Sequence, residues 1–212
     1  MNVSMDNLVS LDIETSSDDL RGNIISIALI KCSDKSREFY REVKFTDGLF
    51  IKSRSMRVNG IDVRHIDENE DAVTLKQLDK EIVNFLDNKR YIMCGSGVSY
   101  FDRKFIEKDL PKSHRLFERP MFDINCFLMG ICVAKKLDYE SIKIKIQLYY
   151  KFLSAENFGV KFKNKDSADI NPKDYLREIK YNMEHNAMYD ARKNIFYLEE
   201  CLKLFYEHET RH

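Results

Sequence analysis

"LVSLDIETSS", residues 8–17, sets two carboxylates two positions apart within a segment that has the apolar alternation of a β-strand. Side chains in a strand alternate between its faces, so Asp12 and Glu14 leave on one face and Leu11 and Ile13 on the other. Like charges at that spacing repel, and burial raises the cost of each unless a cation lies between them. The stretch is therefore either a solvated edge strand or part of a cation-binding site.

Two more strands are predicted directly after this one. "NIISIALI" (23–30) is almost continuously apolar, whereas "REFYREVKF" (37–45) alternates apolar and polar residues, as a half-covered antiparallel edge strand does. The turn "CSDKS" between them is short enough for a hairpin. With the strand at 8–14, these segments predict a three-stranded meander.

The hydrophobic period then changes to that of a helix. "TLKQLDKEIVNFLDN" (74–88) predicts a helix whose Thr74 and Gln77 are spaced as a capping box. A short buried strand (91–95), a helix (99–110), a strand running into an apolar helix (121–127) and a long final helix follow. The pattern predicts an α/β fold with a mixed five-stranded sheet flanked by helices. No linker interrupts residues 1–212, so we expect a single domain.

Composition restricts the possible partners and location. The chain has 35 basic and 35 acidic residues, so any affinity for nucleic acid must come from local charge or from bound metal. No apolar run approaches the ~18–20 residues of a membrane span, and we expect no membrane partner. The five cysteines are odd in number, widely spaced and without a C-x-x-C pair, which favours reduced thiols in a cytoplasmic protein.

Two other acids and one histidine have less obvious structural roles. Asp102, in "VSYFDRKFI", comes just after a buried strand and near a helix start, where ligands collect in open α/β sheets. Asp190 lies beside the apolar stripe of the last helix, between Ala187 and Ala191, whose small side chains permit close approach of another backbone or a substrate. His185 precedes that helix. A single histidine at a helix start is more often a cap or a surface residue than a base.

Taken in order, "LDIET", "YFDRKF" and "HNAMYDA" resemble the three motifs of the DEDDh (DnaQ-like) 3′–5′ exonucleases, a family of the RNase H-like superfamily. The resemblance extends from about residue 8 to about residue 205. "MRVNGIDVRHI" (56–66) is also similar to a stretch that many members carry before their first long helix. D-x-E alone is common in proteins, whereas the ordered set of three motifs is specific.

The resemblance implies a metal-dependent hydrolase of phosphodiester bonds. Asp12, Glu14, Asp102 and Asp190 would bind two Mg²⁺ or Mn²⁺ ions, and four carboxylates would balance their charge. Two such ions ~4 Å apart activate a water, stabilise the leaving oxygen and neutralise the phosphate. His185 would be the general base, since an unperturbed histidine titrates near pH 6.5. The expected reaction removes nucleoside 5′-monophosphates from the 3′ end of single-stranded DNA or RNA.

The resemblance also implies contacts with the terminal nucleotides. Thr15, just after the first motif, would lie near the terminal 3′-OH. Because aromatic or apolar residues adjoin the motifs, we also expect Phe101, Asn59 and Ile61, within or beside those stretches, to wall the pocket. The chain departs from the family in "GSGVSYFD", where many relatives have His-Asn before Phe-Asp, and at Asn59, where His is frequent. The stretch between Asp102 and His185 is also longer than in compact members.

That longer stretch contains a segment rich in lysine and aromatic residues. Residues 135–165 hold eight Lys, no Arg and three acidic residues, with Tyr and Phe interspersed. Lysines can bind phosphates while aromatic rings stack on bases, as in single-strand binding. The favoured interpretation is nevertheless that the lysines solvate helix faces and the aromatic side chains fill the core.

Two other functions remain open at this point. The same residues would serve an enzyme that hydrolyses short oligoribonucleotides or other small nucleotide substrates. A catalytically inert nucleic-acid-binding module on the same fold is the other possibility. The occupation of all five catalytic positions by the expected residue types favours an enzyme. The choice between DNA and RNA depends on contacts to the 2′-OH, which no residue of the sequence reveals, and no protein partner is indicated.

Overall fold

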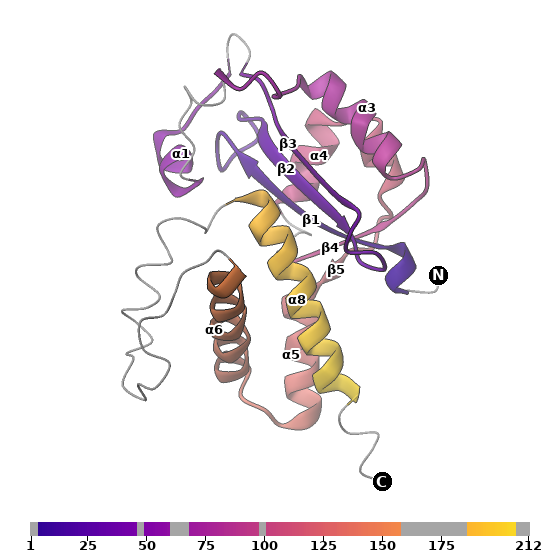
Figure 1. Cartoon of the computed structure of the whole chain (residues 1–212), viewed down its shortest axis with the longest axis vertical. Helices are drawn as coiled ribbons and strands as arrows, with labels where there is room; N and C mark the ends of the chain where they lie inside the picture. Colours follow the sequence, from indigo (N-terminus) through magenta and orange to yellow (C-terminus); the bar gives the residue numbers. More distant parts are fainter. Residues whose placement is uncertain (1–3, 46–48, 60–67, 98–100, 158–185, 207–212) are drawn as a thin grey trace.

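The computed structural model describes residues 4–45, 49–59, 68–97, 101–157 and 186–206. Its centre is a mixed five-stranded sheet in the order β3-β2-β1-β4-β5 (Figure 1). β1 pairs with β2, and β2 with β3, in antiparallel fashion, whereas β1–β4 and β4–β5 are parallel. The predicted fold class is therefore confirmed. The strands are β1 (Leu8–Thr15), β2 (Ile24–Lys31), β3 (Glu38–Glu42), β4 (Ile92–Gly95) and β5 (Phe122–Asp123).

β1 lies in the interior of the sheet, between β2 and β4. All of its residues except Asp12 are buried, and Glu14 keeps only 7% of its surface exposed. The interpretation of residues 8–17 as a solvated edge strand is therefore wrong. Pairing with β4, which begins about eighty residues later, closes the second edge of β1.

Two of the other predicted strands are shorter than expected. β3 ends at Glu42 rather than at residue 45. The amide of Val43 still donates to the carbonyl of Ile25 in β2, but Val43 also forms a bridge to Val73, and the amide of Lys44 donates to the carbonyl of Val73. β5 has only two residues, because the side chain of Asp123 accepts a hydrogen bond from the amide of Cys126 and caps the following helix. The edge position predicted for β3 is confirmed.

Helices cover both faces of the sheet, with α3 and α4 on one face and α5, α6 and α8 on the other (Figure 1). On the first face, Leu78 and Phe105 pack with Val9, Leu11 and Ile13 of β1. The helices are α1 (Ser53–Asn59), α3 (Leu75–Phe85), α4 (Asp102–Asp109), α5 (Ile124–Lys135), α6 (Tyr139–Asn157) and α8 (Ala187–Tyr206), with short 3₁₀ turns η1 (Met5–Asn7) and η2 (Ser113–Leu116). Within the described ranges, no helix has the length and apolar character that crossing a membrane requires.

The capping box predicted at the start of α3 is confirmed. The amide of Gln77 donates to Oγ1 of Thr74 at 3.3 Å, and the amide of Thr74 donates to Oε1 of Gln77 at 2.9 Å. Two backbone amides that a helix start leaves unpaired are thereby satisfied.

α8 packs directly on the face of β1 that carries the acids. Ala187 and Ala191 are fully buried, so no long side chain separates the helix from the strand. Oγ of Ser10 donates a hydrogen bond of 2.8 Å to the carbonyl oxygen of Ala191. The close approach that the two alanines predicted is present, and it brings Asp190 over Asp12 and Glu14.

The described part of the lysine-rich and aromatic-rich stretch is α6 with the residues just before it. Tyr150 is buried between α6 and α8, where its hydroxyl donates to the carbonyl of Tyr189 at 3.2 Å and its ring lies 5.3 Å from that of Phe196. Tyr149 is 49% exposed and packs edge-on against Phe196. Tyr150 is thus a core residue, as the favoured interpretation expects. Residues 158–165 lie outside the described ranges.

The close packing of α8 makes a stability prediction. Ala191→Leu should lower the free energy of unfolding by about 1–3 kcal/mol, because the larger side chain has no space between α8 and β1. Denaturant unfolding in EDTA would measure the change. Ala134→Leu, at an exposed alanine of α5, is the matched control and should be near neutral. Equal unfolding free energies for the two variants would contradict the packing argument.

Candidate metal centre

Three carboxylates converge where α8 crosses β1. One oxygen each of Asp12, Glu14 and Asp190 lies within 4.8 Å of the other two. Asp12 and Glu14 share a face of β1 because they are two residues apart, and Asp190 lies in the first turn of α8. The hydrogen bond from Ser10 to the residue after Asp190 fixes the helix at this height on the strand.

Asp102 is buried nearby, but it stands outside this group of three. It is the first residue of α4, and its carboxylate is hydrogen-bonded by the backbone amides of Ile13 and of Asp102 itself. β4 pairs with β1 only as far as Ser10, so the amide of Ile13 is not used by that strand. Asp102 is nonetheless close enough for its charge to raise the pKa of both Asp12 and Glu14.

Burial and the neighbouring negative charges raise the pKa values of the carboxyl groups at this site. Burial, followed by the charges of Asp190 and Asp102, raises the pKa of Glu14 to about 9. The same causes, with Glu14 added, raise the pKa of Asp12 well above its ordinary value. Burial raises the pKa of Asp102 to about 7, although its two amide partners act in the opposite direction. A divalent cation among these oxygens would remove the penalty on the charged forms.

Lys193 is a functional candidate that sequence reasoning missed. It lies one turn after Asp190 on α8, and its ammonium group is ion-paired with Oδ1 of that aspartate. Its charge also lowers the pKa of Asp12 and Glu14. The available signal was the three-residue spacing between an acid and a lysine on a predicted helix, where such residues are neighbours.

Several predicted site residues fall outside the described ranges or at their limits. His185 immediately precedes the described segment that begins at Asn186, and Ile61 lies within the undescribed stretch 60–67. Asn59 is the last residue of α1, a helix that contacts β1. The structure therefore gives no geometry for the predicted base or for the Ile61 side of the predicted pocket.

The two remaining substrate candidates lie next to the acids along the chain. Thr15 ends β1 and is buried, and its hydroxyl donates to the carbonyl of Ser17 at 2.7 Å. Phe101 directly precedes Asp102 and is half-buried, with its ring centroid 5.0 Å from that of Phe105. Thr15 directly follows Glu14 in the chain, as Phe101 directly precedes Asp102.

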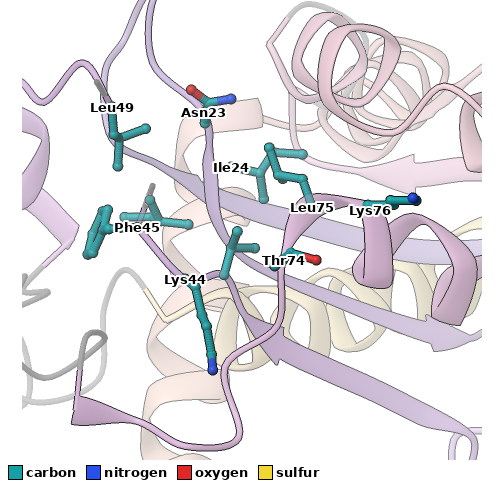
Figure 2. A pocket seen from close by; sticks show the side chains of 10 residues that line it. Asn23, Ile24, Lys44, Phe45, Leu49, Thr74, Leu75 and Lys76 are labelled. Atoms are coloured by element: carbon teal, nitrogen blue, oxygen red, sulfur yellow. The ribbon is translucent and has the colours of Figure 1, made fainter. Parts of the chain in front are cut away.

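A cavity of about 200 Å³ lies elsewhere in the molecule (Figure 2). It is smaller than usual ligand pockets of about 300–1,000 Å³. Its labelled lysines, Lys44 and Lys76, direct their ammonium groups away from the apolar side chains that face one another in Figure 2. Among the described residues that line it there is no carboxylate. Its lining residues are Asn23, Ile24, Ile25, Val43, Lys44, Phe45, Leu49, Thr74, Leu75 and Lys76.

Comparison with known proteins identifies the fold. No protein-family model matches this chain, and no curated protein matches it by sequence. Among solved structures, it is similar to cell-death related nuclease 4 (CRN-4), with a TM-score of 0.54, 15% identity and 94% of this chain covered. It is also similar to the zinc-bound complex of E. coli exonuclease I with single-stranded DNA, with a TM-score of 0.58, 11% identity and 95% of this chain covered.

A third solved structure matches over nearly its whole length. It is the nuclease domain of 3'hExo, described as a DEDDh family member bound to rAMP, with a TM-score of 0.51 and 14% identity. The match covers 93% of this chain and 92% of that domain. By contrast, the match spans 64% of CRN-4 and 41% of the E. coli exonuclease I chain. The protein thus has the RNase H-like fold of these exonucleases, as the sequence predicted.

The raised pKa of Glu14 makes a pH prediction for the metal-free protein. In the unfolded chain this carboxyl ionises near 4.5, whereas in the folded chain it holds its proton to about pH 9. The folded state therefore binds more protons in this interval, and the free energy of unfolding should fall as the pH rises from about 5 to about 9. Glu14→Gln should flatten this decline.

Urea unfolding in EDTA at several pH values would measure the slope. Glu140→Gln, at an exposed glutamate in the first turn of α6, is the matched control and should keep the wild-type slope. If Glu14→Gln declined as steeply as this control, the raised pKa of Glu14 would be refuted.

Proposed function

We propose that this protein is a metal-dependent 3′–5′ exonuclease of the DEDDh family, acting on the 3′ end of a single-stranded nucleic acid. The observation that carries the proposal is the group of three carboxylates within 4.8 Å at a buried, central strand. A structural role does not account for it, because like charges in that position destabilise the fold unless something binds them. The RNase H-like fold and the order of the three sequence motifs support the same assignment.

The residues fit Mg²⁺ or Mn²⁺. Both ions prefer hard oxygen ligands, and the group offers only carboxylate oxygens. Asp12, Glu14 and Asp190 would hold the metal, and Asp102 would complete the set from the start of α4. When bound, two such ions supply charge neutralisation at the scissile phosphate and activation of the attacking water.

The other residues would take the roles that the resemblance implies for them. His185, close in the chain to Asp190, would accept the proton of the attacking water. Thr15 and Phe101, each next to one of the acids in the chain, would bind the terminal nucleotide, together with Asn59 and Ile61. A half-buried ring such as that of Phe101 can stack on a base of any identity, which suits an enzyme that removes successive nucleotides.

Single-stranded DNA and RNA are both proposed as substrates. E. coli exonuclease I was solved with single-stranded DNA, and the 3'hExo domain with the ribonucleotide rAMP. The products would be nucleoside 5′-monophosphates.

The first test is digestion of matched 5′-labelled single-stranded DNA and RNA in Mn²⁺. The wild-type protein should give a ladder that shortens from the 3′ end, and Asp12→Asn should lower the rate at least about 100-fold. Asp34→Asn, in the exposed β2–β3 hairpin, is the control and should leave the rate unchanged. A short series of oligoribonucleotides would be run in parallel.

Two outcomes would contradict the proposal. Cleavage of only the shortest oligonucleotides would indicate an enzyme for small nucleotide substrates. No cleavage of any substrate by a folded protein that binds Mn²⁺ would indicate an inert binding module.

The predicted base has its own test. His185→Ala should lower kcat by about 10²–10⁴-fold, the usual contribution of a positioned general base, while Mn²⁺ affinity stays at the wild-type value. His114→Ala, on η2, is the matched control. Unchanged kcat in His185→Ala would show that another group accepts the proton.

A further inference from the structure

A lysine of the same chain, Lys193, places its ammonium group against one of the three carboxylates. Lys193 is ion-paired with Oδ1 of Asp190, and its ammonium nitrogen lies 5.8 Å from the centroid of the Tyr189 ring. The side chain of Asp190 is only 13% exposed and that of Lys193 is 30% exposed. The ammonium group therefore lies at the boundary between the carboxylates and solvent, on the helix that delivers Asp190.

A second pair on the same helix shows what is particular about Lys193. Lys203 is ion-paired with Glu200 at the same three-residue spacing, and its side chain is 64% exposed. Such pairs on a helix surface are common and contribute little. Lys193 differs because its partner is one of three carboxylates within 4.8 Å. Its charge therefore acts on Asp12 and Glu14 as well as on Asp190.

We propose that Lys193 is the counter-cation of the metal-free site and competes with the divalent metal for it. The inference rests on the proposed metal site. An oxygen of Asp190 that binds the ammonium group is less available to a divalent cation, and two positive charges that close together repel. The flexible four-carbon stem of lysine, partly exposed here, allows the ammonium group to withdraw into solvent when the metal binds. Lys193 thus stabilises the metal-free protein and weakens metal binding.

The test compares three variants of the full chain. Mn²⁺ affinity is measured by calorimetric titration into metal-free protein, and Tm is measured in EDTA and in saturating Mn²⁺. Lys193→Gln should bind Mn²⁺ on the order of tenfold more tightly and should melt at a lower temperature than wild type in EDTA. Lys193→Arg, which keeps the charge, should remain close to wild type in affinity. Lys203→Gln is the matched control and should change neither quantity by much.

Competition with the metal predicts that Lys193→Gln binds Mn²⁺ more tightly but melts at a lower temperature in EDTA, and a purely structural ion pair does not predict this combination. A structural ion pair would lower Tm equally with and without Mn²⁺ and would leave the affinity unchanged, and that result would overturn the inference. Weaker Mn²⁺ binding by Lys193→Gln would also overturn it, because it would show that the ammonium group assists the metal. If Lys193→Gln does not fold in EDTA, Lys193→Arg still decides, since a large change in its affinity contradicts competition by charge.

Failure of the inference is distinguishable from failure of the proposed function. Wild-type protein that takes up no Mn²⁺ would overturn the metal site and the role of Lys193 together. Wild-type protein that binds Mn²⁺ with the same affinity as both glutamine variants would overturn the role of Lys193 alone.

Discussion

Asp12 and Glu14 lie on the inner face of a central strand, and the rest of the site is arranged around the cost of keeping them there. β2 and β4 flank the strand, and α8 covers the face that bears the acids, so water reaches Glu14 poorly and Asp12 only in part. Without metal, two effects reduce the cost: the carboxyl groups hold their protons to higher pH, and Lys193 supplies a positive charge. Neither effect compensates as fully as a divalent cation would, and in the proposed function this difference would drive metal binding.

The topology of the sheet provides the geometry. β4 runs parallel to β1 and stops pairing at Ser10, which leaves the amide of Ile13 for the carboxylate of Asp102. α4 begins at Asp102, whose carboxylate meets the amide of Ile13, and Asp190 lies in the first turn of α8 on the acidic face of β1. The partial positive charge at a helix start favours a nearby carboxylate. Each acid supplied by a helix is therefore placed where the backbone itself helps to hold a negative charge.

Local sequence patterns predicted most of the helices and strands, but they did not predict which segments distant in the sequence pair with one another. The capping box of α3 and the alanine pair of α8 could be found because neighbours in the chain determine them. The alternative of a solvated edge at residues 8–17 was wrong because ten residues carry no information about β4. The end of β3 at Glu42 was missed for the same reason, since Val73, which pairs with the residues that follow, is distant in sequence. Lys193 was missed because a lysine on a helix is ordinarily solvated, and only the tertiary contact of α8 with β1 gives it a role.

The four acids differ in what compensates their charge, a distinction that the motifs alone do not reveal. Asp102 has two backbone amides, whereas Asp12 and Glu14 depend on cations. In the proposed function, the cations that Asp12 and Glu14 require would also help to bind the substrate. The chain as a whole is neutral, and a cluster of acids repels a phosphate. Bound divalent cations would reverse the sign of the local field, so the acids that destabilise the metal-free fold would become the part of the protein that attracts the nucleic-acid backbone.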